Sequence, residues 1–128
     1  MAQQPKKILI VEDDVAIRQL MVLYLEKNGF DVLQAEDGPD ALNRYEDCGE
    51  LHAAVIDWSM PRMTGDELFR RMVDIRPTPP VVFCSGYDTP VFESSLRPGN
   101  VFLRKPYRPQ ELLEALNQAI DEAGRSED

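Results

Sequence analysis

The 128-residue chain has few cysteines, few basic side chains and no apolar run long enough to cross a membrane. Its two cysteines, Cys48 and Cys84, are too few for the disulfide framework of a small secreted domain, and we expect both thiols to be free. Residues 1–7 include two lysines but lack the apolar core and the cleavage site of a signal peptide. We therefore expect a cytoplasmic protein that does not insert into a membrane.

Basic residues number 14 against 23 aspartates and glutamates, which gives a net charge of −9 and a pI of about 4.6. Direct binding to nucleic acid is disfavoured, because it depends on a cationic surface. The length and the hydrophobic content of 43% suit one core and one domain. We expect this domain to span residues 1–128, with an ordered part of about 6–123.

Short apolar runs alternate with segments of helical periodicity along the chain. This alternation is typical of a parallel sheet that is covered by helices on both faces. Asp31 and Gln34, which interrupt the second run, indicate an edge strand. The five predicted strands are residues 7–11, 31–35, 53–56, 81–84 and 101–103.

Four of the intervening segments carry clear helix signals. Residues 37–39 start the second helix, Thr64 opens a capping box before the third, and Pro109 suits the first turn of the last. Gly29 ends the first helix, and Pro77 limits the third. The apolar stripes, which a helix normally turns to the core, are Ile17, Leu20, Met21, Tyr24 and Leu25; Ala41, Leu42 and Tyr45; Leu68, Phe69, Met72 and Ile75; and Leu112, Leu116, Ala119 and Ile120.

Carboxylates follow two of the predicted strands at the point where each strand ends. Glu12 and Asp13 come after the first strand, and Asp57 comes after the third. Neighbouring parallel strands end at the same edge of a sheet, so we expect these acids to converge. Converging carboxylates repel one another unless a cation lies among them or one is protonated. Mg²⁺ suits the set, with Mn²⁺ as an alternative ion: Asp13 and Asp57 bind directly, Glu12 through water, and Ser59 adds its backbone carbonyl.

A hydroxyl and an ammonium group follow the next two strands. Ser85 comes after the fourth strand and Lys105 after the fifth. Each alone has an ordinary explanation, as a turn serine and a solvated lysine, just as Asp14 alone is explained as a helix cap. Together with the acids they make a site that can hold a phosphoryl group. Asp57 would be the nucleophile, and Lys105 and the cation would neutralise the transferred oxygens.

Three segments resemble the receiver domain of response regulators, the CheY-like family of two-component signalling. They are residues 8–14 (ILIVEDD), 57–65 (DWSMPRMTG) and 102–107 (FLRKPY), and the likeness extends over about residues 6–123. The resemblance implies a doubly wound α/β fold with the flavodoxin-like strand order 2-1-3-4-5. The chain looks most similar to receivers of hybrid sensor kinases.

By this resemblance, Asp57 accepts a phosphoryl group from a phosphohistidine of a histidine kinase or a histidine phosphotransfer protein, in a Mg²⁺-dependent reaction. The domain is implied to promote its own phosphotransfer and autodephosphorylation, and to control a downstream protein partner by changing conformation. The peptide bond before Pro106 is expected to be cis. The other implied site residues are the acidic pair Glu12 and Asp13, the lysine Lys105, and the switch residues Ser85 and Phe102.

The sequence departs from the family's pattern within residues 86–104. This stretch is shorter than usual and contains Pro90 and Pro98, so we expect a shortened fourth helix of about two turns. Ser59 and Tyr87 flank the site, and we expect them to tune hydrolysis by shaping the access of water.

Three other functions fit the sequence less well. A phosphohydrolase with an aspartyl nucleophile commonly has a second acid two residues later, where this chain has Ser59. A nucleotide- or flavin-binding module of the same topology needs a glycine-rich or hydroxyl-rich loop after the first strand, where residues 12–14 are acidic. A degenerate receiver that only binds partners would lack a chemical group, and every such position is filled.

Overall fold

The apolar runs form one parallel sheet whose strands lie in the order β2-β1-β3-β4-β5, as predicted. The computed structural model describes residues 4–86 and 100–126. The inner strands are almost wholly buried, whereas both edge strands are partly exposed. The strands are β1 (Lys7–Val11), β2 (Asp31–Ala35), β3 (Ala53–Asp57), β4 (Val81–Ser85) and β5 (Val101–Arg104).

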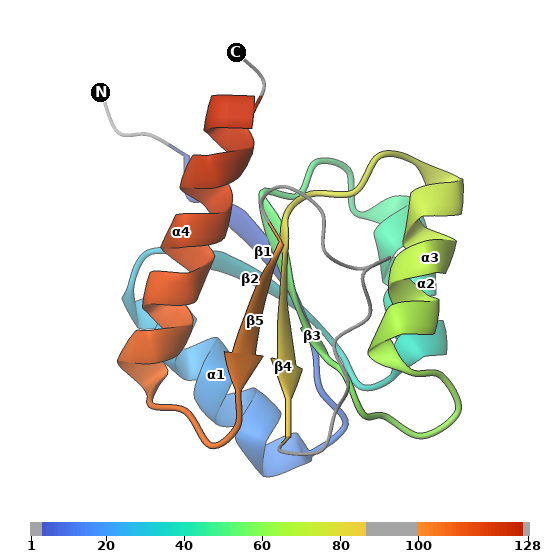
Figure 1. Ribbon diagram of the computed structural model, residues 1–128, viewed down its shortest axis with the longest axis horizontal. Helices are drawn as coiled ribbons and strands as arrows, with labels where there is room; N and C mark the ends of the chain where they lie inside the picture. The colour runs from blue at the N-terminus through green and yellow to red at the C-terminus, as the bar shows by residue number, and fades with distance from the viewer. Residues whose placement is uncertain (1–3, 87–99, 127–128) are drawn as a thin grey trace.

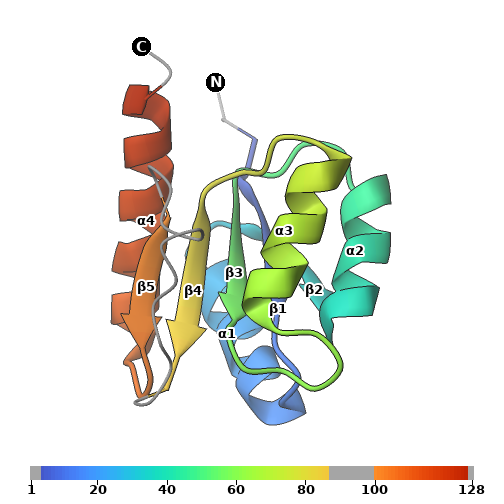
Figure 2. The ribbon, with the colours of Figure 1, turned by 45° about the vertical axis from the view of Figure 1, so that its right-hand side comes forward.

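Helices cover both faces of the sheet (Figure 1 and Figure 2). One layer consists of α1 (Val15–Lys27) and α4 (Pro109–Ser126), and the other of α2 (Gly38–Asp47) and α3 (Gly65–Ile75). Successive residues of a strand point to opposite faces. In β1, for example, Ile8 and Ile10 pack toward α1 and α4, while Leu9 and Val11 pack toward α2 and α3.

The helices begin where the sequence predicts, because side chains satisfy their first free backbone N–H groups. Asp14 accepts from the N–H of Ile17 at 3.0 Å, and Asp37 accepts from that of Asp40 at 2.9 Å. Thr64 caps α3 in the same way. Gly29 follows the end of α1 with a φ of 91°, a left-handed conformation that glycine adopts without strain.

The strand register brings the chemical residues to one edge of the sheet. Asp57 pairs with Cys84 across β3 and β4, and Ser85 pairs with Arg104 across β4 and β5. The arrowheads of β4 and β5 point to this edge in Figure 1. Residues that directly follow β1 and β5, namely Glu12 and Lys105, therefore lie beside the ends of β3 and β4.

Three apolar side chains expected in the core lie at the surface instead. Ile17 and Leu20 of α1 are 40% and 68% exposed, and Ile75 of α3 is 38% exposed. Helix α1 is apolar on nearly all sides, so periodicity alone does not identify its buried side, which Met21 and Leu25 occupy. Ile75 is the last residue of α3, where no further turn shields it.

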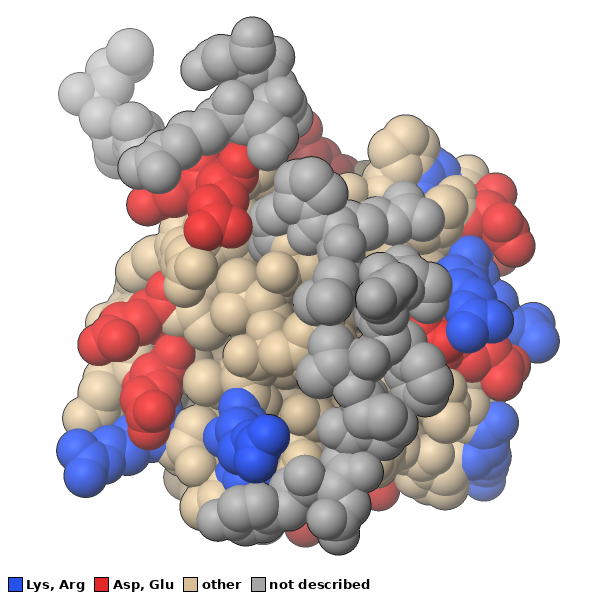
Figure 3. All heavy atoms as spheres, viewed as in Figure 1, with Lys and Arg blue, Asp and Glu red and all other residues tan. Residues whose placement is uncertain are grey.

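Several further predictions concern the chain as a whole. Cys48 is the C-terminal cap of α2, Cys84 is buried, and both thiols are free. Within residues 4–86 and 100–126, no helix is both long and apolar enough to cross a bilayer. The visible surface mixes charges, with acidic side chains over α4 and basic ones beside acidic ones over α3 (Figure 3). Tyr87 and the shortened helix expected between Pro90 and Pro98 lie outside the described residues, and α4 is the last of the predicted helices.

Candidate functional site

Three carboxylates meet at the carboxyl edge of the sheet. Glu12 and Asp13 follow β1, Asp57 ends β3, and one carboxylate oxygen of each lies within 4.8 Å of the others. Asp13 is exposed, whereas Glu12 and Asp57 are only 2% and 5% exposed. The structure thus brings together the acids that the sequence predicts to converge, with two of them largely removed from water.

Lys105 reaches into this acidic cluster from the end of β5. Its Nζ lies 3.1 Å from Oδ1 of Asp57 and 3.6 Å from Oε1 of Glu12. Its backbone N–H donates to the carbonyl oxygen of Ser85 at 2.7 Å, which extends the β4–β5 pairing by one residue. The bond between Lys105 and Pro106 is cis, as predicted. One ammonium group therefore faces two buried carboxylates and their exposed neighbour.

The pKa values reflect this imbalance of charge. Burial, together with the negative charge of Asp57, raises the pKa of Glu12 to about 7. Burial also raises the pKa of Asp57, although the ammonium of Lys105 opposes the shift. For Lys105 itself, burial lowers the pKa, but the two carboxylates outweigh that effect and the net shift is upward. The ammonium stays charged, and the cluster retains negative charge that a further cation can neutralise.

The turn after β1 is ordered by its own side chains and by the sheet. The backbone N–H of Glu12 donates to the carbonyl oxygen of Ala35 at 3.2 Å, which continues the pairing with β2. The carboxylate of Glu12 accepts from the N–H of Asp14 at 3.2 Å. Asp14 caps α1, as the helix-cap interpretation of the acidic run predicts. The other two acids of the run, Glu12 and Asp13, belong to the acidic cluster.

The loop after β3 is held close to Asp57. The N–H of Ser59 donates to Oδ1 of Asp57 at 3.3 Å, and the N–H of Trp58 donates to the carbonyl of Cys84 at 2.8 Å. Gly65 permits this approach, because a Cβ there would lie 2.8 Å from the carbonyl oxygen of Asp57. The backbone of residues 57–59 is thereby held beside the acidic cluster.

The donor set fits a hard divalent cation. The cluster offers carboxylate oxygens, one of its three acids is open to water, and its buried negative charge exceeds what Lys105 supplies. Mg²⁺ is normally bound by one or two carboxylates and retained waters, and Mn²⁺ accepts the same ligands. Phosphorylated groups are commonly bound where such an ion and a lysine meet.

A family model described as the response regulator receiver domain matches residues 8–117. The chain belongs to the response regulator receiver family. Receiver domains act in two-component systems, where phosphorylation on an aspartate and Mg²⁺ binding are typical of the family. They are signalling domains that interact with kinases and downstream effectors.

Known receivers resemble this one over most of its length. It is 28% identical over 116 residues to the chemotaxis protein CheY of Thermotoga maritima, covering 88% of this chain and 96% of CheY. It is 32% identical over 118 residues to the sensor kinase CckA of Brucella abortus, covering 89% of this chain but 12% of the kinase. A solved receiver of the hybrid histidine kinase CckA aligns at 34% identity with a TM-score of 0.76, covering 89% of this chain and 98% of that one. The expected likeness to receivers of hybrid kinases is confirmed.

The two predicted switch residues occupy different surroundings in this receiver. Ser85 ends β4 at the same edge as the carboxylates and is 9% exposed. Phe102 of β5 is half-buried and stacks on Phe83 with ring centroids 5.2 Å apart. It also lies 5.4 Å from the ring of Trp58, the residue that follows Asp57. An aromatic cluster therefore connects β5 to the loop after the site, and the switch role of both residues stays a prediction.

Sequence reasoning missed how the loop after β3 is fastened to the rest of the receiver. Arg62 has a φ of 72°, a left-handed conformation that is uncommon outside glycine, and its Nη1 pairs with Oδ2 of Asp37 at 3.0 Å. Next to it, Met63 packs so closely on Gly38 that a Cβ there would lie 2.6 Å from the Met63 sulfur. Gly38 is the one signal in the sequence for such a close approach of Met63 to the start of α2.

Proposed function

We propose that Asp57 is the phosphoacceptor of this receiver. An oxygen of its carboxylate attacks the phosphorus of a phosphohistidine on a histidine kinase or a histidine phosphotransfer protein. The O–P bond forms while the P–N bond breaks, and the departing imidazole nitrogen keeps the electron pair. The observation that carries this proposal is the position of Asp57, whose carboxylate belongs to the acidic cluster and also contacts the Lys105 ammonium at 3.1 Å.

We assign the metal site to Asp13 and Asp57 as direct ligands, Glu12 through water, and the backbone carbonyl of Ser59. When bound, Mg²⁺ or Mn²⁺ supplies positive charge against the oxygens of the phosphoryl group. The proposal is supported by the convergence of the three carboxylates and by the hydrogen bond that holds Ser59 to Asp57.

Lys105 and Ser85 would complete the binding of the phosphoryl group. The ammonium of Lys105 shifts from the free carboxylate to a phosphoryl oxygen, and the hydroxyl of Ser85 donates to another. As Ser85 moves toward the phosphoryl group, Phe102 turns inward behind it and changes the surface of β5. This movement would be the signal that a downstream protein partner detects.

The receiver would also reset itself by hydrolysis, without turning over a separate substrate. A water oxygen attacks phosphorus, the bond between phosphorus and Asp57 breaks, and the carboxylate and inorganic phosphate are released, with the water protons passing to phosphate or solvent. Ser59 is exposed beside Asp57 and is placed to shape the approach of that water. Tyr87, the other expected neighbour, lies outside the described residues.

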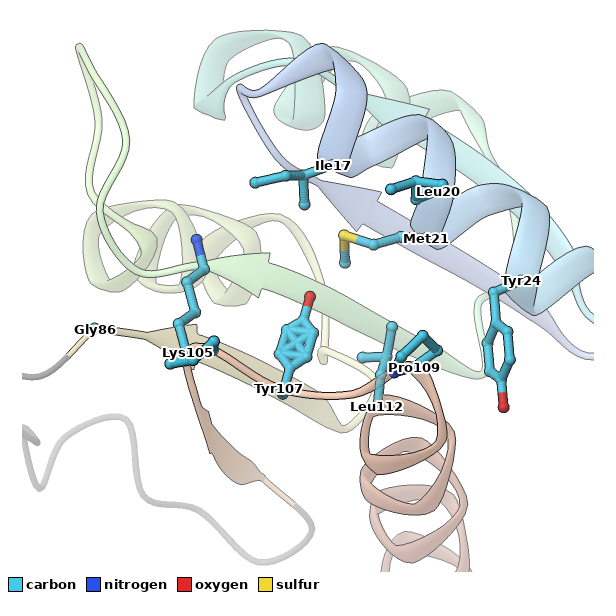
Figure 4. A pocket seen from close by; sticks show the side chains of 10 residues that line it. Ile17, Leu20, Met21, Tyr24, Gly86, Lys105, Tyr107, Pro109 and Leu112 are labelled. Carbon is cyan, nitrogen blue, oxygen red and sulfur yellow. The ribbon is translucent and has the colours of Figure 1, made fainter.

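The phosphoryl donor would dock on α1, beside the site. A groove of about 590 Å³ separates α1 from the start of α4, and Ile17, Leu20 and Met21 face Tyr107 and Leu112 across it (Figure 4). Lys105 lines one end of this groove and also contacts Asp57. A helical donor that covers the groove thus brings its phosphohistidine to the acidic cluster. We place this phosphoryl transfer in the cytoplasm, where reducing conditions keep thiols such as those of Cys48 and Cys84 free.

Labelling with acetyl phosphate tests the phosphoacceptor. The native receiver should gain one phosphoryl group by intact mass when Mg²⁺ is present and none when the metal is chelated. Asp57→Asn should abolish the labelling, whereas Asp74→Asn, which removes an exposed acid on α3, should leave it unchanged. Labelling that survives Asp57→Asn, or that does not need a divalent cation, would reject the assignment.

A further inference from the structure

Arg18 connects the acidic turn to the sheet from its place in α1. Its Nη1 donates to the backbone carbonyl oxygen of Glu12 at 2.7 Å, and its Nε donates to Oε1 of Gln34 on β2 at 3.1 Å. We propose that Arg18 is a positioning residue for the metal site: it fixes the backbone of the Glu12–Asp13 turn and thereby raises the affinity for Mg²⁺. The inference rests on the proposed function of this site.

The carbonyl of Glu12 needs such a partner because the sheet ends at this point. Val11 and Ala35 are the last paired residues of β1 and β2, and Ala35 already accepts the N–H of Glu12. Glu12 is 2% exposed, so its carbonyl has little access to water. A buried acceptor without a partner is unfavourable, and the chain would move to give it one. Arg18 supplies the hydrogen-bond donor that a neighbouring strand would otherwise provide.

An arginine suits this task better than another donor. Its guanidinium is a rigid plane with several N–H groups, so it can donate to two acceptors in fixed relative positions. Gln34 holds one side of the plane, and the other side is thereby aimed at Glu12. The turn that carries Asp13 is connected through this plane to α1 and to β2 at once.

Charge and position predict opposite effects for the loss of Arg18. A positive charge near a cation site weakens cation binding by Coulomb repulsion, so its removal alone would strengthen the binding of Mg²⁺. Loss of the bond to Glu12 would instead loosen the ligands and weaken binding. Arg44 provides the matched control. Arg18 and Arg44 both line a polar pocket of about 530 Å³, but Arg44 pairs with Asp40 and not with the acidic turn.

The experiment compares the Mg²⁺ dissociation constants of the native receiver, Arg18→Met and Arg44→Met, taken from amide shifts in NMR titrations. Methionine keeps the length of the side chain and removes both the charge and the donors. Arg18→Met should bind Mg²⁺ about 10-fold more weakly, as is typical when a partner of a metal ligand is lost. Arg44→Met should bind as well as the native receiver or slightly better.

Two further measurements keep the test independent of the metal and of misfolding. In metal-free protein, amide hydrogen exchange over residues 13–17 should speed up in Arg18→Met and stay unchanged in Arg44→Met. Gln34→Leu, which leaves the charge of Arg18 in place but frees one side of its guanidinium, should weaken Mg²⁺ binding in the same direction and by less.

Failure of the inference is distinguishable from failure of the proposed function. A native receiver that does not bind Mg²⁺ at all contradicts the proposed metal site. A native receiver that binds Mg²⁺, with Arg18→Met and Gln34→Leu binding equally well or more tightly, overturns the role of Arg18 alone.

Discussion

Among the described residues, the α2–α3 layer buries its large apolar side chains more completely than the α1–α4 layer does, and we call these the closed layer and the open layer. On the α2–α3 side, Leu68, Phe69 and Met72 are at most 1% exposed. On the α1–α4 side, by contrast, α1 leaves Leu20 and Leu23 68% and 53% exposed. A helix that is apolar on nearly all sides is normally buried in a larger core or covered by a partner. The comparison therefore fits the proposed docking of a phosphoryl donor on α1, with the α2–α3 layer mainly stabilising the receiver.

The positions of the connecting loops support this division. The loop after β3 is fastened to the start of α2 by the Arg62–Asp37 pair and by the packing of Met63 on Gly38. The groove beside α1 instead opens at Lys105, which contacts Asp57. Lys105 thus joins the groove of the open layer to the acidic cluster.

The largest effect on stability is expected when a buried side chain of the closed layer is shortened. Leu68→Ala should lower the free energy of unfolding by about 2–5 kcal/mol, because it opens a cavity at a side chain that is fully buried. Urea denaturation of the metal-free receiver measures this change. A loss below about 1 kcal/mol would show that the α2–α3 side collapses around the gap and is not the rigid layer.

A smaller effect on stability is expected at the carboxyl edge of the sheet, where pH changes the charge of Glu12. Its pKa is about 7 in the folded receiver and 4.5 as an ordinary glutamate, so between these values the folded state holds the proton more tightly. The stability of the metal-free receiver should therefore fall as the pH rises from 4.5 to 7. Thermal unfolding across this range measures the slope.

The matched variant for the pH test is Glu12→Gln, which cannot ionise. It should flatten the fall in stability, and Mg²⁺ should stabilise the native receiver more at the upper end of the range than at the lower end. A native receiver whose stability rises steadily from pH 4.5 to 7 would contradict the upward shift of the Glu12 pKa.

The smallest effect on stability is expected in the open layer. Leu20→Ser should change the free energy of unfolding by no more than about 0.5 kcal/mol, since the side chain is largely in water. Labelling by acetyl phosphate should be unchanged. Phosphotransfer from a histidine-phosphorylated donor protein should slow by about 10-fold, the effect of losing an important interface side chain.

Ile75→Ser is the control for this last variant, because it removes an exposed isoleucine from the closed layer, on α3. It should leave both kinds of labelling intact. Equal slowing in the two variants would indicate a general loss of surface hydrophobicity and would remove α1 as the docking surface.

Much of the fold could be predicted because its signals are local. Apolar runs bounded by helical segments specify a doubly wound sheet, and the carboxyl ends of parallel strands then bring Glu12, Asp57 and Lys105 together. The edge place of β2 followed from the polar residues within it. The roles of these side chains in phosphoryl transfer remain predictions.

The features that could not be predicted depend on contacts between distant backbone and side-chain groups. Arg18 resembles any half-buried helical arginine until the carbonyl that it binds is known. Arg62 adopts a left-handed conformation that is usually predicted only where the sequence has a glycine. Ile17 and Leu20 follow the apolar period of α1, but the period of an almost wholly apolar helix does not say which side meets the sheet.

Trp58, the single tryptophan of the chain, is joined by one peptide bond to Asp57 and packs edge-on against Phe83. Indole emission responds to nearby charge and to the arrangement of neighbouring rings. The receiver therefore carries its own optical probe, and we expect the proposed binding of an ion or a phosphoryl group at Asp57 to change the native fluorescence in real time, with no attached dye.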